Sequence, residues 1–168
     1  MVIWDTNILA LYFSGRLSSD DQIRMNGLVS ELSRKKETIG IPAQVWAEFL
    51  EAASQEEAEE SVKLFKSNAF SLLAYDMRCA IETAEVARQG QTVRKSTKGP
   101  KRDRQAVKVD WQIIAIAKVN QARLLLSNDG PMAAEAIRQG LNCMKISELP
   151  IPDNGRQHSI RFEEDIPD

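Results

Sequence analysis

Four acidic residues in the sequence occupy positions where carboxylates can do chemistry: Asp5, Glu48, Asp110 and Asp129. Asp5 and Asp129 each come shortly after a run of apolar residues that is typical of a buried strand. Glu48 and Asp110 lie in segments of helical period, each in line with apolar residues that we expect to face a sheet. A helix cap or a buried salt bridge would explain any one of these acids alone. Together they predict one acidic site, since crowded carboxylates are tolerable mainly when a cation neutralises them.

The donor atoms of this predicted site are all oxygens, which indicates the class of cation. Carboxylates and water molecules are the usual ligands of Mg²⁺ and Mn²⁺ in proteins. We expect Asp5 and Asp110 to be direct ligands, and Glu48 and Asp129 to act partly through water, because Mg²⁺ often retains several waters. The candidate metal ligands and catalytic residues are therefore Asp5, Glu48, Asp110 and Asp129.

Several other catalytic chemistries lack the residues that they need. The single histidine, His158, lies in a proline-rich C-terminal segment, which argues against a pair of histidine bases and against a histidine-rich zinc site. No Ser-His-Asp or Cys-His arrangement can be assembled, and no GxxxxGK[ST] loop is present, so acyl transfer and P-loop ATP chemistry are unsupported. Cys79 and Cys143 are too few for a disulfide framework, and we expect both to be buried, reduced thiols.

The order of apolar and helical segments indicates the fold that positions these acids. Short apolar runs alternate with longer segments of helical period, which is typical of βαβ units around a parallel sheet. In open parallel sheets, ligands bind beyond the carboxyl ends of the strands, which is where Asp5 and Asp129 fall. The sequence predicts an α/β fold with a central parallel sheet of about five strands. The expected strands are residues 2–4, 38–41, 70–74, 122–127 and 142–146.

A chain of 168 residues suits one domain, which we assign to residues 1–150, followed by a peripheral acidic tail at 151–168. Within the domain, a basic insert is expected at about residues 90–108. Its glycines, its proline and its lack of apolar period predict a loop from Gly90 to Ala106. The apolar stretches are far shorter than the ~20 residues that span a bilayer, and no export signal is evident. We therefore expect a cytoplasmic protein without a membrane partner.

Four sequence blocks occur in a characteristic order. Asp5-Thr6-Asn7 follows the first expected strand, and Glu48 lies in the helix after the second. Asp110 opens a helix of small and aliphatic residues, and Ser127-Asn128-Asp129 follows a later strand. Each block is weak alone, but their joint order and strand context are fairly specific. Over roughly residues 2–146 the chain resembles the PIN-domain nucleases.

The resemblance implies a Rossmann-like α/β/α sandwich and an endoribonuclease that hydrolyses RNA phosphodiester bonds with Mg²⁺ or Mn²⁺. Many compact members of the family are VapC-like toxins of bacterial toxin–antitoxin pairs, so a cognate antitoxin and a homodimer are further expectations. The chain departs from the family in three places, one of which is an additional tail past Pro150. Gly130-Pro131-Met132 replaces a further acid and an aromatic residue, and the basic insert is longer than in compact toxins.

Polar and basic residues beside the acids are candidates for holding the substrate. Thr6, Asn7 and Ser127 lie at the strand ends, although ordinary helix capping is the simpler role for them. Eight of the 22 basic residues lie between positions 88 and 108. Lysine and arginine contacts to phosphates supply most of the non-specific affinity for RNA, whereas a solvated loop is the alternative for such a run. The candidate substrate-binding residues are Thr6, Asn7, Ser127, Arg102, Arg104 and Lys108.

Two other classes of protein fit part of the pattern. A non-catalytic PIN-like module would keep the fold and the basic insert in order to bind RNA or protein. The presence of all four acids argues against it, because loss of catalysis would remove the reason to tolerate their repulsion. A phosphatase of the haloacid-dehalogenase kind would use Asp5 as a covalent nucleophile, but such sites resemble Asp-x-Asp and Asn7 holds the second place. The nuclease is therefore the favoured hypothesis.

Overall fold

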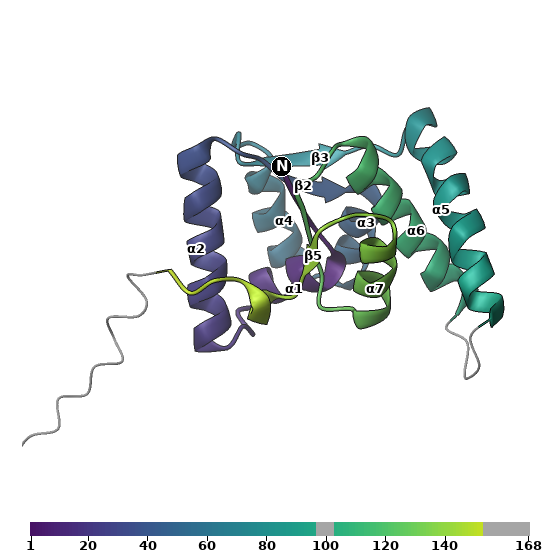
Figure 1. The fold of residues 1–168 in the computed structure, drawn as a ribbon. Helices are drawn as coiled ribbons and strands as arrows, with labels where there is room; N and C mark the ends of the chain where they lie inside the picture. The colour runs from purple at the N-terminus through teal and green to yellow at the C-terminus, as the bar shows by residue number, and fades with distance from the viewer. Residues whose placement is uncertain (97–102, 153–168) are drawn as a thin grey trace, which may run out of the picture.

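The computed structural model describes residues 1–96 and 103–152, which form a parallel sheet with helices packed around it (Figure 1). The strand order is β3-β2-β1-β4-β5, so β1 lies at the centre. Every neighbouring pair is parallel, and Ile3 of β1 lies beside Gly40 of β2 and Leu125 of β4. The predicted five-stranded parallel sheet is confirmed. The strands are β1 (Val2–Trp4), β2 (Ile39–Pro42), β3 (Phe70–Leu73), β4 (Leu124–Leu126) and β5 (Cys143–Met144).

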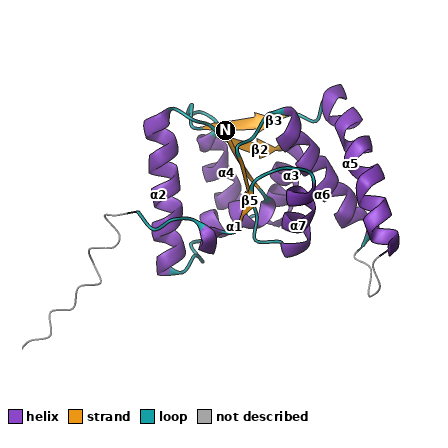
Figure 2. Ribbon diagram, in the orientation of Figure 1, coloured by secondary structure: helices purple, strands orange, loops and turns teal. Residues whose placement is uncertain are grey.

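Helices connect successive strands and enclose the sheet (Figure 2). In Figure 1, α2 lies at one end of the molecule, and α5 with α6 lies at the other. The helices are α1 (Thr6–Ser14), α2 (Ser19–Lys35), α3 (Ala43–Ala52), α4 (Gln55–Leu64), α5 (Met77–Ser96), α6 (Arg104–Val119), α7 (Gly130–Arg138) and the short 3₁₀ turn η1 (Ile146–Glu148). No helix in the described part of the chain has the length and apolar character needed to cross a membrane.

The central strands are buried on both faces, as expected for a parallel sheet covered by helices. All three residues of β1 and Leu125 of β4 are 0% exposed. Trp4 packs against aromatic rings on both sides, with its ring centroid 5.1 Å from that of Tyr12 and 5.6 Å from that of Phe70. Each fully buried aliphatic or aromatic side chain stabilises the fold by about 1.5–3 kcal/mol. This apolar centre holds the ends of β1 and β4 in a fixed relation.

The prediction that residues 90–106 form a loop is wrong at both ends. Helix α5 continues through Gly90 to Ser96, and α6 begins at Arg104, capped by the Asp103 carboxylate, which accepts hydrogen bonds from two backbone N–H groups. No apolar period marks the start of α6, because Arg104, Gln105 and Ala106 are exposed there. A Cβ atom on Gly90 would lie 2.8 Å from Nε1 of Trp111, so glycine permits this contact. Residues 97–102 lie outside the described part.

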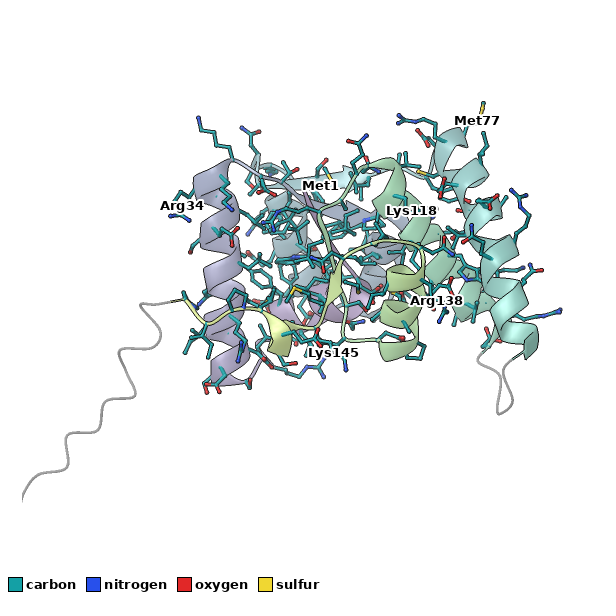
Figure 3. All side chains as sticks on the ribbon, in the orientation of Figure 1. Met1, Arg34, Met77, Lys118, Arg138 and Lys145 are labelled. Carbon is teal, nitrogen blue, oxygen red and sulfur yellow. The ribbon has the colours of Figure 1, made fainter. Side chains whose placement is uncertain are left out.

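Helix α5 is exposed at its first residue and forms an ion pair with α6 further along. Met77, the first residue of α5, is 78% exposed and points away from the body of the molecule (Figure 3). Further along, Glu82 of α5 forms an ion pair with Lys118 of α6. Both partners are about one-quarter exposed, so the pair contributes on the order of 0–1 kcal/mol. The two helices are therefore held together mainly by their close packing.

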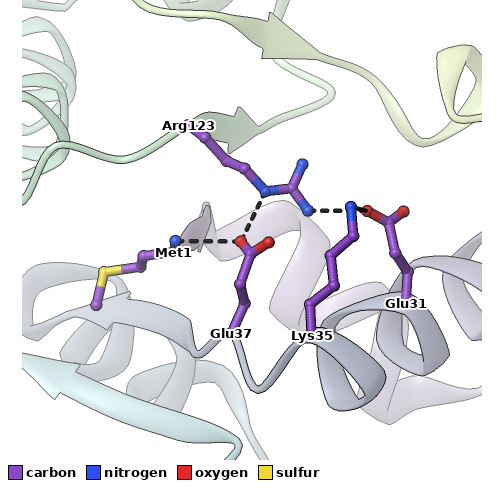
Figure 4. Close-up of polar contacts among 5 residues, drawn as sticks. All are labelled: Met1, Glu31, Lys35, Glu37 and Arg123. Carbon is purple, nitrogen blue, oxygen red and sulfur yellow. Dashed lines mark hydrogen bonds and ion pairs between the residues drawn. The ribbon is translucent and has the colours of Figure 1, made fainter.

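Figure 4 shows an ion-pair network around Arg123, at the end of the sheet where β1 and β4 begin. Arg123, just before β4, donates through Nε to Glu37 Oε2 at 2.7 Å, and its guanidinium lies 3.3 Å from Glu31 Oε1. The amino group of Met1 lies 3.3 Å from Glu37 Oε2. The hydrogen bond from Arg123 is the main cause that lowers the pKa of Glu37. The network joins the starts of β1 and β4 to the end of α2.

Candidate active site

The candidate site lies at the carboxyl ends of β1 and β4, as predicted for a parallel sheet. Trp4 pairs with Leu126, and the backbone N–H of Asp5 donates to Leu126 O at 3.1 Å. Asp5 therefore leaves β1 where Ser127 leaves β4. Ser127 is 0% exposed, and its hydroxyl donates to Asp5 Oδ2 at 2.7 Å. Two segments more than 120 residues apart in the chain meet here in a direct side-chain contact.

The carboxylate of Asp5 is held by three neutral donors. Oδ2 accepts from Ser127 Oγ at 2.7 Å and from Asn7 Nδ2 at 2.5 Å, and Oδ1 accepts from the backbone N–H of Thr6 at 2.7 Å. A carboxylate has about two acceptor sites on each oxygen. Both sites of Oδ2 are therefore used, and one site of Oδ1 remains. This remaining site is where Asp5 can bind a ligand without losing a hydrogen bond.

The electrostatic environment of Asp5 opposes its negative charge. Burial is the largest effect and raises its pKa above the ordinary value, while hydrogen bonds from Ser127 and Thr6 lower it. The negative charges of Glu48 and Asp129 raise the pKa of Asp5 further. Asp5 is only 6% exposed, so water screens these charges weakly. The structure thus brings Glu48 and Asp129 close enough to Asp5 for the charge of each to act on its carboxyl group.

Glu48 reaches the site from α3, but it is not buried against the sheet. The expectation that it faces the sheet is wrong, because its side chain is exposed while Val45 and Phe49 are buried. Neighbouring helical residues differ by about 100° in direction, which is enough to turn Glu48 off the buried stripe. Its Oε2 instead accepts a hydrogen bond from Thr6 Oγ1 at 2.6 Å. Thr6 therefore connects the Glu48 carboxylate to the backbone next to Asp5.

Asp129 combines the capping role that the sequence allowed with a place in the site. Its Oδ1 accepts from the backbone N–H of Met132 at 2.8 Å, which caps α7. Its own backbone N–H donates to Ser127 Oγ at 3.1 Å. The Ser127 hydroxyl therefore links the two acids, since it donates to Asp5 and accepts from the backbone of Asp129. The Asp129 side chain is half-buried.

Asp110 lies half-buried on α6, a helix that packs against α3. Gln112, two residues later, accepts a hydrogen bond through Oε1 from Gln44 Nε2 of α3 at 3.4 Å. This contact brings the helix of Asp110 next to the helix of Glu48. Across residues 1–96 and 103–152, no three His, Cys, Asp or Glu side chains are close enough to form a preformed metal cluster. The four acids therefore come from neighbouring elements without forming a closed cage.

Two asparagines, one of them missed from sequence, fix the orientation of the site. The backbone N–H of Asn128 donates to Asn7 Oδ1 at 3.0 Å, so the amide nitrogen of Asn7 must face Asp5. The side-chain oxygen of Asn128 accepts from the backbone N–H of Ile146 at 3.1 Å. Asn128 thereby connects the end of β4 to the start of η1. Its place between Ser127 and Asp129 in a turn was the available signal.

The structure describes two of the three basic residues predicted to bind substrate. Arg102 lies outside the described residues. Arg104 and Lys108 are exposed on the first two turns of α6. Lys108 and Asp110 point about 160° apart around an ideal helix, although they are two positions apart in sequence. The Lys108 side chain therefore does not lie next to that of Asp110 on α6.

Both cysteines are buried and free, in agreement with the sequence prediction. Burial is the main cause that raises the pKa of the Cys143 thiol, to about 11, and the charge of Asp5 raises it further. The thiolate is the reactive form of cysteine, so a thiol with this pKa is a poor nucleophile at neutral pH. Cysteine chemistry does not compete with the carboxylates as the function of this site.

Comparison with known proteins relates the chain to others by fold. The sequence matches no protein-family model and no curated protein. Among solved structures, VapBC2 from Rickettsia felis bound to a DNA fragment from their promoter aligns with a TM-score of 0.60 and 18% identity, over 86% of this chain and 98% of that one. The fold is PIN-like. This confirms the fold that the four sequence blocks implied.

Two more solved structures share the PIN-like fold of this chain. DNA-bound VapBC from Salmonella typhimurium has a TM-score of 0.56 and 14% identity, over 86% of this chain and 97% of that one. VapBC-1 from nontypeable Haemophilus influenzae has a TM-score of 0.57 and 13% identity, over 88% of this chain and 100% of that one. Identities this low establish a common architecture, and the chemistry has to be argued from the site.

Proposed function

We propose that this chain is an endoribonuclease that depends on Mg²⁺ or Mn²⁺. The observation that carries the proposal is the environment of Asp5, a buried carboxylate whose pKa is raised by burial and by the charges of Glu48 and Asp129. Its hydrogen-bond donors are a backbone amide, a side-chain amide and a hydroxyl, all of them neutral. A divalent cation would offset this repulsion, and the oxygen donors fit a hard cation.

The residues of the chain have distinct roles in this mechanism. Asp5 would hold the cation through the open acceptor site of Oδ1, while Asn7 and Ser127 keep its carboxylate in one orientation. The hydroxyl of Thr6 would orient Glu48, and Asp129 and Asp110 would add negative charge from α7 and α6. The chemistry supplied by Mg²⁺ or Mn²⁺, if held by these residues, would be activation of a water molecule and stabilisation of charge on a scissile phosphate. Orientation by neutral donors leaves the full carboxylate charge for the cation.

Removal of the metal tests this proposal directly. We expect the purified protein to cleave labelled single-stranded RNA in Mn²⁺ or Mg²⁺, to lose that cleavage after dialysis against EDTA, and to regain it when the ion is added back. The reason is that a bound divalent cation would acidify the attacking water and offset the negative charge of the phosphate, whereas carboxylates alone repel an anionic substrate. Cleavage products resolved on a denaturing gel give the rate. Undiminished cleavage in excess EDTA would contradict the metal role, and metal-independent RNA binding without cleavage would favour the non-catalytic alternative.

A protein partner is part of the proposal. The solved structures that share the fold are VapBC assemblies, two of which are bound to DNA. We infer that this chain is the toxin of a toxin–antitoxin pair, with a cognate antitoxin that blocks its site. Support comes from the fold and from coverage of nearly the whole length of those chains.

The exposed basic residues at the start of α6 are proposed to hold the RNA backbone. Replacing Arg104 and Lys108 with alanine should weaken RNA binding and reduce the salt dependence of the binding constant, by a slope of about 0.7 for each phosphate that is no longer neutralised. Fluorescence anisotropy across a salt series measures both quantities. The matched control replaces Arg34 and Lys66, two exposed basic residues outside α6. Equal slopes for the two double variants would rule out a specific role for α6.

A further inference from the structure

We propose that Gln44 and Gln112 form a side-chain pair that positions the helix of Asp110 against the helix of Glu48. Gln44 Nε2 of α3 donates to Gln112 Oε1 of α6 at 3.4 Å. Gln44 lies one helical turn before Glu48, and Gln112 lies two residues after Asp110. The inference rests on the proposed metal-dependent function and assigns further residues to the same site.

Gln112 lies among buried apolar residues, where an apolar side chain would be expected to pack better than an amide. In the stretch 111–117 of α6, the other six residues are buried and apolar, and Gln112 alone is polar and half-buried. The part of this amide that is shielded from water loses hydration unless a hydrogen bond replaces it, whereas an aliphatic side chain of similar volume has no such loss. Net stability therefore does not account for the amide at this position.

The state of Gln44 supports the same conclusion. Its Oε1 atom is buried and has no hydrogen-bond partner within the described residues. A buried acceptor without a donor is costly, so the Gln44–Gln112 pair carries an uncompensated polar group as well as one hydrogen bond. Since the pair stabilises the fold so little, we attribute its role to the defined geometry that a hydrogen bond imposes on the two helices. Hydrogen bonds require a defined distance and angle, while apolar contacts tolerate sliding.

The position of the pair indicates which motion it restrains. Asp5, Glu48 and Asp129 are connected to one another by the hydrogen bonds of Thr6 and Ser127. Asp110 lies on a separate helix, and the pair is a direct polar link from that helix to α3. With the link in place, α6 cannot slide along α3 without breaking a hydrogen bond. Because Gln112 and Asp110 point about 160° apart around an ideal helix, the pair would act on Asp110 without contacting it, by fixing the position of α6 along α3.

The test compares stability with metal affinity in variants that remove one or both amides. Gln44→Leu and Gln112→Leu alone should each lower the thermal unfolding midpoint, because each leaves a buried amide unpaired. The double variant should unfold at or above the wild-type temperature, since both polar groups are replaced. We nevertheless expect its affinity for Mn²⁺, measured by isothermal titration calorimetry, to fall about tenfold, the lower end of the losses seen when groups supporting metal ligands are removed.

A matched control and a second variant keep the result interpretable. The control replaces Gln22 and Asn26, an amide pair on α2 with a 2.9 Å hydrogen bond, and should leave Mn²⁺ affinity unchanged. If the double leucine variant does not fold, Gln112→Asn keeps an amide but is one methylene too short for the contact, and should show the same loss of affinity. Wild-type Mn²⁺ affinity in the folded double variant, or in Gln112→Asn, would overturn the positioning role and leave the proposed function intact. Absence of Mn²⁺ uptake by the wild-type protein would instead refute the proposed function, and the inference with it.

Discussion

Asp5→Asn is expected to abolish metal-dependent RNA cleavage while leaving the protein folded. Asparagine keeps the shape of the side chain and can still cap α1, but it lacks the charge that would bind a cation. We expect the cleavage rate at saturating Mn²⁺ to fall by more than about 100-fold, because loss of a group that only supports a metal ligand already costs ~10–100-fold. Cleavage assays give the rate, and circular dichroism with thermal unfolding reports the fold.

The matched control for this variant is Asp20→Asn. Asp20 is exposed in the first turn of α2, where the same substitution removes a charge without touching the site. The control should cleave RNA at the wild-type rate. If a folded Asp5→Asn protein, free of contaminating nuclease, cleaves as fast as the control, Asp5 has no catalytic role. Retained Mn²⁺ binding by that variant would likewise place the metal elsewhere.

Ser127→Ala is expected to have the second largest effect, a loss of about 10–100-fold in Mn²⁺ affinity. The Ser127 hydroxyl is fully buried and donates to Asp5 Oδ2, while it accepts from the backbone N–H of Asp129. Without it, the Asp5 carboxylate loses a hydrogen bond that lowers its pKa, so its protonated form is favoured. A carboxylate that is more often protonated and less well oriented binds a cation more weakly. Calorimetric titration with Mn²⁺ measures the change.

Two comparisons separate this effect from a general loss of stability. Ser30→Ala changes an exposed serine on α2 and should leave both Mn²⁺ affinity and the unfolding midpoint unchanged. The affinity lost in Ser127→Ala should diminish as the pH of the titration is raised, because the Asp5 carboxyl becomes ionised in both proteins. An affinity equal to wild type at neutral pH would show that the hydroxyl does not support a metal ligand. A loss that is the same at every pH would exclude the change in the pKa of Asp5 as its cause.

The strands and the acids at their ends were predictable because both are local signals. The three-residue apolar runs of β1 and β4 are buried whatever surrounds them, since a central parallel strand has helices on both faces. An acid directly after such a run then falls at the carboxyl edge of the sheet. Asp5 and Asp129 were placed correctly for this reason. The start of α6 within residues 90–106 was missed because Arg104, Gln105 and Ala106 are exposed and so have no apolar periodicity.

The hydrogen bonds that organise the site could not be predicted from the sequence. Asn128 supports Asn7, and Gln44 contacts Gln112, only because loops and helices far apart in the chain are adjacent in space. Glu48 shows the same limit, since helical periodicity assigned it to the sheet face and the structure exposes it beside Thr6. Which side of a buried stripe a residue falls on depends on how the helix is rotated against its neighbours. That rotation is a property of the packed molecule.

By itself, the sequence determined the parallel α/β architecture and the edge of the sheet where the acids lie, since apolar runs and strand ends are local features of the chain. Only the tertiary structure decided that Asp5 is buried beside two other negative charges, that neutral groups orient it, and that Asp110 comes from a helix tied to α3. The physical reason is that burial, charge interaction and hydrogen bonding depend on distances of a few ångströms between residues remote in sequence. Such distances are settled when the helices and the sheet pack together.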